Sequence, residues 1–430
     1  MEGPSPPTGG PARRVRIEKL APTGEGIART SEGVGFIDRA LPGELVETSI
    51  YERRRRFWRG SLRAILEPSA DRVATAHADC VGCDWAHFAM AAARRAKGEL
   101  FLETMQRIGH LSPALFGTPL PAASPEGYRL RTRFHVAGRG LAARVGYFAP
   151  GTHRVVDASA CEAISSATRA LLPALEESLG AQGVDASEAA ILEDIPGARR
   201  LLRVTGVVDA AGQAEFADRL SLGFQGVRVR SPEGALSWEG GEPRLSLDVS
   251  SRRFQVSVDA FFQGNRHLVS RLAADVAGEA AGCPPGDALD AFGGVGLFAG
   301  ALLSAGHRVT SVEFDPGAAA DARATREGWA DRDHWTLAAS SIQEFLRDDS
   351  RRFDVVVVDP PRAGLGTGLA VEIARRARRL LLYVSCDPAT LARDLPAMQE
   401  EGLEIRSARL YDLFAGTHRV EALVALKRAE

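Results

Sequence analysis

The chain has 430 residues, of which 45% are hydrophobic and 25% charged, a composition typical of folded globular proteins. This length predicts two or three domains. No segment approaches the roughly 20 apolar residues of a membrane-spanning helix. The Pro/Gly-rich start, Met1–Gly10, lacks the apolar core of a secretory signal. Five cysteines do not form a disulfide scaffold in a chain this long, and we expect a reducing, cytoplasmic compartment.

Charge is unevenly distributed along the chain. Residues 1–160 carry 23 Lys and Arg against 16 Asp and Glu, whereas the remaining 270 residues carry 30 against 39. The excess of basic residues in 1–160 predicts that this part of the chain binds an anionic partner.

Residues 1–12 are predicted to be a disordered tail, and residues 13–70 a small β domain. Strands are predicted at Val15–Leu20, Gly33–Asp38, Glu44–Tyr51 and Gly60–Leu66, a pattern typical of a five-stranded OB-type barrel. The segment 53–59 then places five arginines beside two aromatic residues, Phe57 and Trp58. It is either a solvated loop or a phosphate-binding edge with stacking platforms for nucleic acid.

The middle of the chain combines helices with a strand-rich α+β region. Apolar spacing predicts a helix over His87–His110 and another near Glu162–Leu179. Arg129, Arg131 and Arg133 alternate, so they share one face of a strand. That face is either a solvated surface or a basic stripe against a phosphate backbone.

From residue 286 the pattern changes to alternating strands and helices, which predicts a doubly wound α/β domain. A glycine-rich loop with Phe292, Gly294 and Gly296 follows its first strand. Glu313 ends the next strand, where a carboxylate can accept both hydroxyls of a ribose. The Gly-x-Gly spacing also suits a dinucleotide, so an NAD-dependent enzyme is an alternative.

Two later motifs favour a different chemistry. The apolar strand Val355–Val358 runs into Asp359 and two prolines, which form a rigid turn at the edge where an open α/β sheet binds ligands. A further strand, Leu380–Val384, runs into Cys386, and Pro388 suits the first turn of a following helix. A helix N-terminus lowers the pKa of a nearby thiol, so we expect a nucleophilic thiolate, which a dehydrogenase does not need.

With these residues the chain strongly resembles the bacterial RNA (uracil-C5)-methyltransferase family over nearly its whole length. The matching motifs are Ile17-Glu18-Lys19-Leu20, Ala40-Leu41-Pro42-Gly43-Glu44, Phe261-Phe262-Gln263-x-Asn265, Ser385-Cys386-Asp387-Pro388-x-Thr390-Leu391 and Phe414-x-x-Thr417-x-x-Val420-Glu421. The resemblance implies an α/β fold with three parts. They are an OB-type RNA-binding barrel called TRAM (13–70), a strand-rich α+β central domain (71–86 and 120–260) and a Rossmann-like methyltransferase domain (87–119 and 261–430). The helix near 87–112 is implied to pack on the methyltransferase domain.

The resemblance also implies the site residues. S-adenosylmethionine contacts fall on Gln263, Phe292, Gly294, Gly296, Glu313 and Asp359, the nucleophile on Cys386 and the general base on Glu421. Carbon 5 of uracil is a poor nucleophile, and addition of a thiolate to carbon 6 places negative charge on it. The target base has to leave its stack to be reached.

The implied activity is therefore methylation of uracil C5 in structured RNA through a covalent Cys386 adduct, with 23S ribosomal RNA as the substrate. The alternatives are transfer RNA, then an RNA cytosine-C5 methyltransferase, then a non-catalytic RNA-binding factor. We expect a monomer without membrane association.

A cysteine set near the barrel departs from the family pattern. Members with a 4Fe–4S cluster carry Cys-x5-Cys-x2-Cys and a fourth cysteine in the central domain. Cys80, Cys83 and Cys161 match the last three positions, whereas Ala74 stands at the first. Three interpretations stay open, namely a cluster with a non-cysteine ligand such as His77, a metal-free site and a zinc site.

Overall fold

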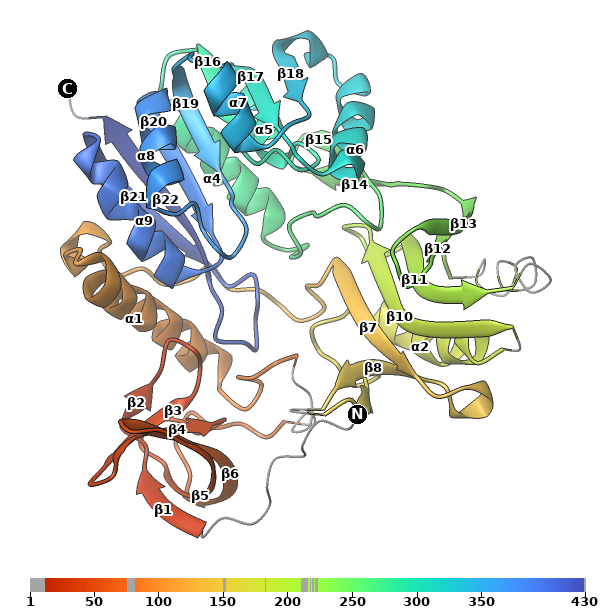
Figure 1. Ribbon diagram of the computed structural model, residues 1–430, viewed down its shortest axis with the longest axis vertical. Helices are drawn as coiled ribbons and strands as arrows, with labels where there is room; N and C mark the ends of the chain where they lie inside the picture. Colours follow the sequence, from red (N-terminus) through yellow and green to blue (C-terminus); the bar gives the residue numbers. More distant parts are fainter. Residues whose placement is uncertain are drawn as a thin grey trace.

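The computed structural model describes residues 12–75, 82–149, 152–181, 183–209, 216, 218, 220 and 223–428. They form a small N-terminal barrel, a central domain built on one sheet and a large C-terminal α/β domain (Figure 1). No helix within these ranges is both long enough and apolar enough to span a bilayer. Residues 1–11 of the predicted tail lie outside these ranges, as do His77 and Cys80.

The N-terminal domain is a six-stranded sheet with the order β1-β5-β6-β4-β3-β2, and contacts between β1 and β3 curl it into a barrel. Its strands are β1 (Ala12–Arg16), β2 (Lys19–Leu20), β3 (Gly26–Thr30), β4 (Gly33–Asp38), β5 (Leu45–Arg53) and β6 (Phe57–Glu67). The predicted strand Gly33–Asp38 has these bounds in the structure. Sequence patterns do not predict β3, and the predicted strand Val15–Leu20 is divided between β1 and β2.

The central domain is a seven-stranded sheet with the order β13-β12-β11-β10-β7-β8-β9 and contains the helix α2 (Ser166–Leu179). Its strands are β7 (Arg131–Ala137), β8 (Arg144–Phe148), β9 (Val155–Asp157), β10 (Val184–Glu193), β11 (Arg200–Val208), β12 (Gly226–Arg230) and β13 (Leu236–Gly241). The Ser165 side chain accepts a hydrogen bond from Thr168 N and so caps α2. The predicted strand-rich α+β fold is confirmed.

The C-terminal domain has a seven-stranded sheet with the order β18-β17-β16-β19-β20-β22-β21. Its strands are β16 (Asp287–Asp290), β17 (Arg308–Val312), β18 (Trp335–Ala338), β19 (Phe353–Val358), β20 (Ala377–Ser385), β21 (Leu403–Tyr411) and β22 (Glu421–Arg428). Its helices are α4 (Val269–Ala281), α5 (Leu297–Ser304), α6 (Pro316–Glu327), α7 (Ile342–Asp348), α8 (Thr367–Arg376) and α9 (Pro388–Glu400). The first five strands in the sheet order are parallel, which confirms the predicted doubly wound fold.

One hairpin that precedes the main run of this domain packs onto it. The hairpin of β14 (Leu245–Val249) and β15 (Arg252–Val256) contacts α4 and α6, although it precedes the predicted domain start at residue 261. Short 3₁₀ turns lie at Pro113–Leu115, Gly140–Ala142 and Arg332–His334.

Helix α1 (Met90–Gly109) precedes the central domain in the sequence but packs against α9 (Figure 1). Phe101 and Met105 of α1 share a buried cluster with Leu391 of α9. The helices approach closely at Gly109, where a Cβ would lie 2.6 Å from the Ala392 carbonyl oxygen. A side chain at this position would therefore separate the two helices.

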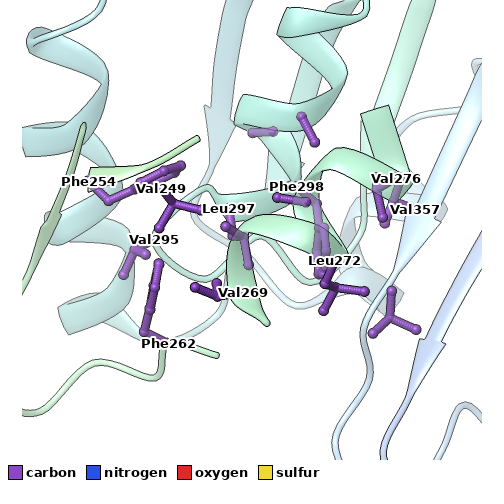
Figure 2. Packing of buried hydrophobic residues seen from close by; sticks show 14 of the residues in the cluster. Val249, Phe254, Phe262, Val269, Leu272, Val276, Val295, Leu297, Phe298 and Val357 are labelled. Carbon is purple, nitrogen blue, oxygen red and sulfur yellow. The ribbon is translucent and has the colours of Figure 1, made fainter. Parts of the chain in front are cut away.

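Apolar side chains cover both faces of the C-terminal sheet. In β19, Val355 and Val357 face the cluster that contains α4 and α5, whereas Val356 and Val358 face the cluster that contains α1, α8 and α9. Figure 2 shows the first cluster, with Val357 among residues of α4, α5 and the β14–β15 hairpin. Each of the four valines is fully buried, and each contributes roughly 1.5–3 kcal/mol to folding. A strand buried on both faces explains the unbroken apolar run in the sequence.

Candidate active site

Segments from several strands meet at one edge of the C-terminal sheet. The parallel strands β16, β17, β19 and β20 end there, and the antiparallel strand β22 begins there. Ser385 of β20 pairs with Ala422 of β22. One step further toward this edge, Cys386 and Glu421 therefore lie opposite each other. Strand pairing alone brings the two predicted catalytic residues together.

Cys386 lies between the end of β20 and the N-terminus of α9. Asp387 caps that helix, because its Oδ1 accepts hydrogen bonds from Ala389 N (2.9 Å) and Thr390 N (3.0 Å). Pro388 takes the first helical position. The thiol of Cys386 is left half-buried at the edge of the sheet.

The predicted lowering of the Cys386 pKa is wrong. Burial, followed by the negative charges of Glu421 and Asp359, raises the pKa of this thiol to about 11, against the opposing charge of Arg362. The dipole of one helix N-terminus is a smaller effect than lost solvation together with nearby carboxylates. The thiol is therefore protonated at neutral pH unless positive charge is added beside it.

Glu421 is 1% exposed, and its Oε1 has no hydrogen-bond partner among the described residues. Burial, followed by the charge of Asp359, raises the pKa of this carboxyl well above its ordinary value. Burial also raises the pKa of Asp359 to about 7, although Gln263 Nε2 donates a hydrogen bond of 2.8 Å to it. A carboxyl group whose pKa is raised can take up and return a proton more readily near neutral pH than an ordinary one.

The glycine-rich loop after β16 is arranged around Glu313. The carboxylate of Glu313 accepts hydrogen bonds from Gly294 N (2.8 Å) and Asp315 N (2.6 Å). Gly296 has a φ of +99°, and a Cβ there would lie 2.2 Å from the Trp335 ring, so this position requires glycine. The predicted residues of the loop thus form one hydrogen-bonded unit with the end of β17.

A cavity of about 270 Å³ lies beside this loop. Phe292, Glu313 and Phe314 line it on one side, with Ser340 and Gln343 from the segment around the start of α7. Phe314 is 76% exposed, and no sequence signal marks it, because a single aromatic residue after a strand is not a motif. The structure therefore adds an exposed aromatic ring to the predicted pair Phe292 and Glu313.

Asp290 begins the loop that resembles the family's S-adenosylmethionine site, and its carboxyl is fully buried. Its Oδ2 accepts hydrogen bonds from Ala299 N (3.1 Å) and the Ser311 hydroxyl (3.4 Å), while its Oδ1 has no partner among the described residues. Burial, followed by the charge of Asp359, raises the pKa of Asp290 to about 7. The glycine-rich motif that begins at Asp290 is the sequence signal for this position, whereas the raised pKa follows from its burial in the fold.

Of the two aromatic residues predicted as stacking platforms on the barrel, Trp58 is contradicted by the structure and Phe57 stays a prediction. Trp58 is fully buried and belongs to the barrel core, because alternate residues of β6 point inward. Phe57 instead packs edge-on against Phe36, with ring centroids 5.9 Å apart. Both rings line a groove of about 730 Å³ that also contains Arg56 and, from α1, Arg107. This groove combines aromatic and basic side chains, as surfaces that bind single-stranded nucleic acid do.

The predicted arginine stripe of the central sheet is also divided. Arg131 turns its guanidinium to the Ala260 carbonyl oxygen (3.1 Å), and Arg129 contacts the Gly82 carbonyl oxygen (3.4 Å). The Arg133 side chain is 67% exposed and pairs with Glu188. Of the three, Arg133 is the one whose exposure suits contact with a phosphate backbone.

Two cysteines of the predicted set, Cys83 and Cys161, lie among the described residues. Cys161 lies in an apolar cluster of the central domain, and Cys83 packs against the same cluster. Ala74 supplies no thiol at the first position, so the residues do not fit a four-cysteine iron–sulfur site. No group of three or more metal-ligating side chains occurs among the described residues. A set of Cys80, Cys83 and Cys161 with His77 stays a prediction, because Cys80 and His77 fall in the gap 76–81.

Comparison with known proteins agrees with this geometry. The family model described as tRNA (Uracil-5-)-methyltransferase matches residues 241–429, and the TRAM domain model matches residues 9–63. An uncharacterized RNA methyltransferase of Streptomyces avermitilis is 32% identical, over 96% of this chain and 98% of its own length. The 23S rRNA (uracil(1939)-C(5))-methyltransferase RlmD of Halomonas elongata is 30% identical, over 97% of this chain and 90% of its own.

The chain belongs to the RNA (uracil-C5)-methyltransferase family. As a member it is an S-adenosylmethionine-dependent RNA methyltransferase with an N-terminal TRAM domain. The fold also matches the crystal structure of Pyrococcus abyssi tRNA (uracil-54, C5)-methyltransferase in complex with S-adenosyl-L-homocysteine. That match has a TM-score of 0.75 and 20% identity, and it covers 96% of this chain and all of the other.

Proposed function

We propose that this enzyme methylates carbon 5 of a uracil in 23S ribosomal RNA through a covalent adduct between Cys386 and carbon 6. The observation that carries the proposal is the pairing of β20 with β22, which sets Cys386 opposite the buried Glu421. Such a reaction needs a thiol as the nucleophile and a carboxyl as the base, and Cys386 and Glu421 supply these two groups at one edge of the sheet.

In the proposed reaction, the Cys386 thiolate adds to carbon 6 of the uracil, and the electron pair of the 5,6 double bond shifts onto carbon 5. S-adenosylmethionine supplies an electrophilic methyl group, which carbon 5 takes while the sulfonium becomes a thioether. Glu421 then removes the proton on carbon 5, the double bond re-forms, and Cys386 leaves as a thiolate. Atoms and charge balance, since one proton is released for each methyl group transferred.

The raised pKa values of Cys386 and Glu421 fit this order of events. Cys386 needs added positive charge to ionise, and a sulfonium beside the carboxylates Asp359 and Glu421 would supply it. Thiolate formation would thus be coupled to cosubstrate binding. A carboxylate of raised pKa is also a stronger base, as the removal of the carbon-5 proton requires.

The cosubstrate site is proposed to comprise Gln263, Phe292, Gly294, Gly296, Glu313 and Asp359. Glu313 already accepts two backbone hydrogen bonds, and each of its oxygens keeps a second lone pair for a ribose hydroxyl. The exposed ring of Phe314 could cover an adenine on the same cavity. Asp359 is tied to Gln263, so the two would act together.

Two substitutions test the chemistry. Cys386→Ala should abolish methylation while RNA binding persists, because no nucleophile remains. Glu421→Gln should accumulate a methylated RNA–protein adduct that survives a denaturing gel. Cys283→Ala is the matched control, since this buried cysteine lies after α4 and away from the site. Normal turnover by the Glu421→Gln variant would exclude its role as the base.

The choice of RNA has two candidates. The full-length match to the RlmD relative, barrel included, favours 23S rRNA. The family model named for tRNA favours transfer RNA as the second candidate. Mass spectrometric mapping of 5-methyluridine in both RNAs from a deletion strain distinguishes them. We expect one or two sites to be lost from 23S rRNA, and a loss confined to tRNA would refute that choice.

A further inference from the structure

The loop 412–420 connects β21 to β22 and ends at the proposed base, Glu421. Successive carbonyl oxygens of this loop accept hydrogen bonds from residues that are far away in the sequence. The bonds run from Asn265 Nδ2 to Leu413 O (3.1 Å), from Lys97 Nζ to Phe414 O (3.2 Å), from the Tyr128 hydroxyl to Ala415 O (3.0 Å) and from Trp85 N to Gly416 O (2.9 Å). The donors come from different parts of the molecule: α1, the segment before β7, the segment before α4 and the segment that carries Cys83.

The N-terminal barrel reaches the same loop through the segment 82–88. Trp85 Nε1 donates to the Gly24 carbonyl oxygen of the barrel (2.8 Å). Asp84 pairs with the His418 ring and accepts a hydrogen bond from His418 N (3.1 Å). Barrel and loop also touch directly, because a Cβ on Gly24 would lie 3.0 Å from His418 Cβ. The loop is therefore a junction where all three domains meet.

These contacts matter because of how Glu421 is held. Its Oε1 has no hydrogen-bond partner among the described residues, so no hydrogen bond fixes that oxygen and its position depends on packing and on the backbone of Glu421. That backbone continues directly from the loop, and a buried loop carbonyl that loses its donor has to move or remain unsatisfied. A small shift at residues 415–418 would therefore be passed on to the carboxyl.

We propose that the loop 412–420 is the positioning device for Glu421, and that Tyr128 and Asp84 act through it on the removal of the carbon-5 proton. The proposal rests on the proposed function above. Cys386 is held separately, by the end of β20 and the Asp387 cap of α9. Damage to the loop contacts should consequently slow proton removal and spare thiol addition and methyl transfer.

The test uses Tyr128→Phe, which removes one hydroxyl from a residue 3% exposed, and Asp84→Asn, which removes the charge that pairs with His418. Substrate RNA is labelled with tritium at uracil carbon 5, and single turnovers are followed with a methyl label on the cosubstrate. Methyl incorporation reports adduct formation and transfer, whereas tritium release reports proton removal. We expect each variant to slow tritium release roughly fivefold at an unchanged methyl incorporation rate, with adduct accumulating on a denaturing gel.

Asp185→Asn is the matched control, since it removes an ion pair with Arg139 on the central sheet, away from the loop. Thermal unfolding of each variant shows whether it folds. Equal slowing of methyl incorporation and tritium release by both variants, or no change in either rate, would overturn the proposal. Glu421→Gln distinguishes failure of the loop proposal from failure of the proposed function. If adduct accumulates with Glu421→Gln but not with Tyr128→Phe or Asp84→Asn, only the role of the loop is refuted. If no adduct accumulates with Glu421→Gln, the role of Glu421 as the base is refuted.

Discussion

Replacing Asp290 with asparagine should change the pH dependence of stability in a way that can be calculated. Asp290 is fully buried, and its pKa is raised from 3.8 to about 7. The folded protein therefore retains a proton that the unfolded chain releases. The stability linked to this proton is fully present below pH 3.8. It falls progressively as the pH rises from there, and the loss is complete once the pH has passed the folded pKa of about 7.

Linkage gives the size of the effect. Relative to a neutral side chain, the carboxyl lowers the free energy of unfolding by about 2 kcal/mol near pH 5 and by about 4 kcal/mol near pH 8. The amide oxygen of the substituted side chain can still accept from Ala299 N, and any fixed cost of the amide is the same at both pH values. The stability of Asp290→Asn relative to the wild type should therefore increase by about 2–3 kcal/mol between pH 5 and pH 8.

The assay is urea unfolding at both pH values. Trp329 and Trp335 are stacked in the same domain with centroids 4.9 Å apart, and they report its unfolding by fluorescence. Asp248→Asn is the control, because this carboxyl is exposed and pairs with Arg253 on the surface. If the stability difference between wild type and Asp290→Asn were the same at both pH values, the carboxyl would not carry a raised pKa.

The remaining predictions concern the thiol, a buried ion pair and a glycine. With a pKa of about 11, Cys386 should be about one part in a thousand thiolate near pH 8, so its alkylation by iodoacetamide should rise about tenfold per pH unit above that. Asp359→Asn should speed this alkylation, and a plateau below pH 8 would contradict the raised pKa. Lys97→Met leaves the buried Asp412 unpaired and should lower the free energy of unfolding by about 3–5 kcal/mol, whereas Lys97→Met with Asp412→Leu should recover most of it in the same urea assay. If the double variant were as unstable as Lys97→Met alone, the unpaired Asp412 would not be the cause of the lowered free energy of unfolding. Gly296→Ala should lower the melting temperature by several degrees, because Gly296 has a positive φ and the added Cβ meets the Trp335 ring. Gly278→Ala should not lower it, because no described residue lies within 4 Å of a Cβ at that position. Equal melting temperatures for the two variants would contradict the clash.

Local signals in the sequence predict much of the C-terminal domain. The run Val355–Val358 is apolar on both faces, and it forms a strand buried on both faces. Pro388 predicts the first turn of α9, and the structure has the helix beginning there, with Asp387 as its cap. The first prediction succeeds because an unbroken apolar run is itself the signature of burial on both faces, and the second because the capping hydrogen bonds of α9 lie within three residues of Asp387.

Predictions that depend on distant residues fail. The Cys386 pKa is set by Glu421 and Asp359, which are brought beside it by strand pairing and not by neighbouring sequence. The arginines around Trp58 suggest a surface position for this ring, yet the register of β6 turns it into the barrel. The contacts of the loop 412–420 have no sequence signature either, since their donors are backbone groups and side chains hundreds of residues away.

The packing of α1 on α9 has a consequence for how this protein is made. During synthesis, α1 leaves the ribosome with Phe101 and Met105 uncovered, and its partner helix starts only at Pro388. At cellular translation rates the delay is on the order of tens of seconds. Nascent chains should therefore expose the apolar face of α1 for most of their elongation, which makes this segment prone to aggregation until α9 has been made.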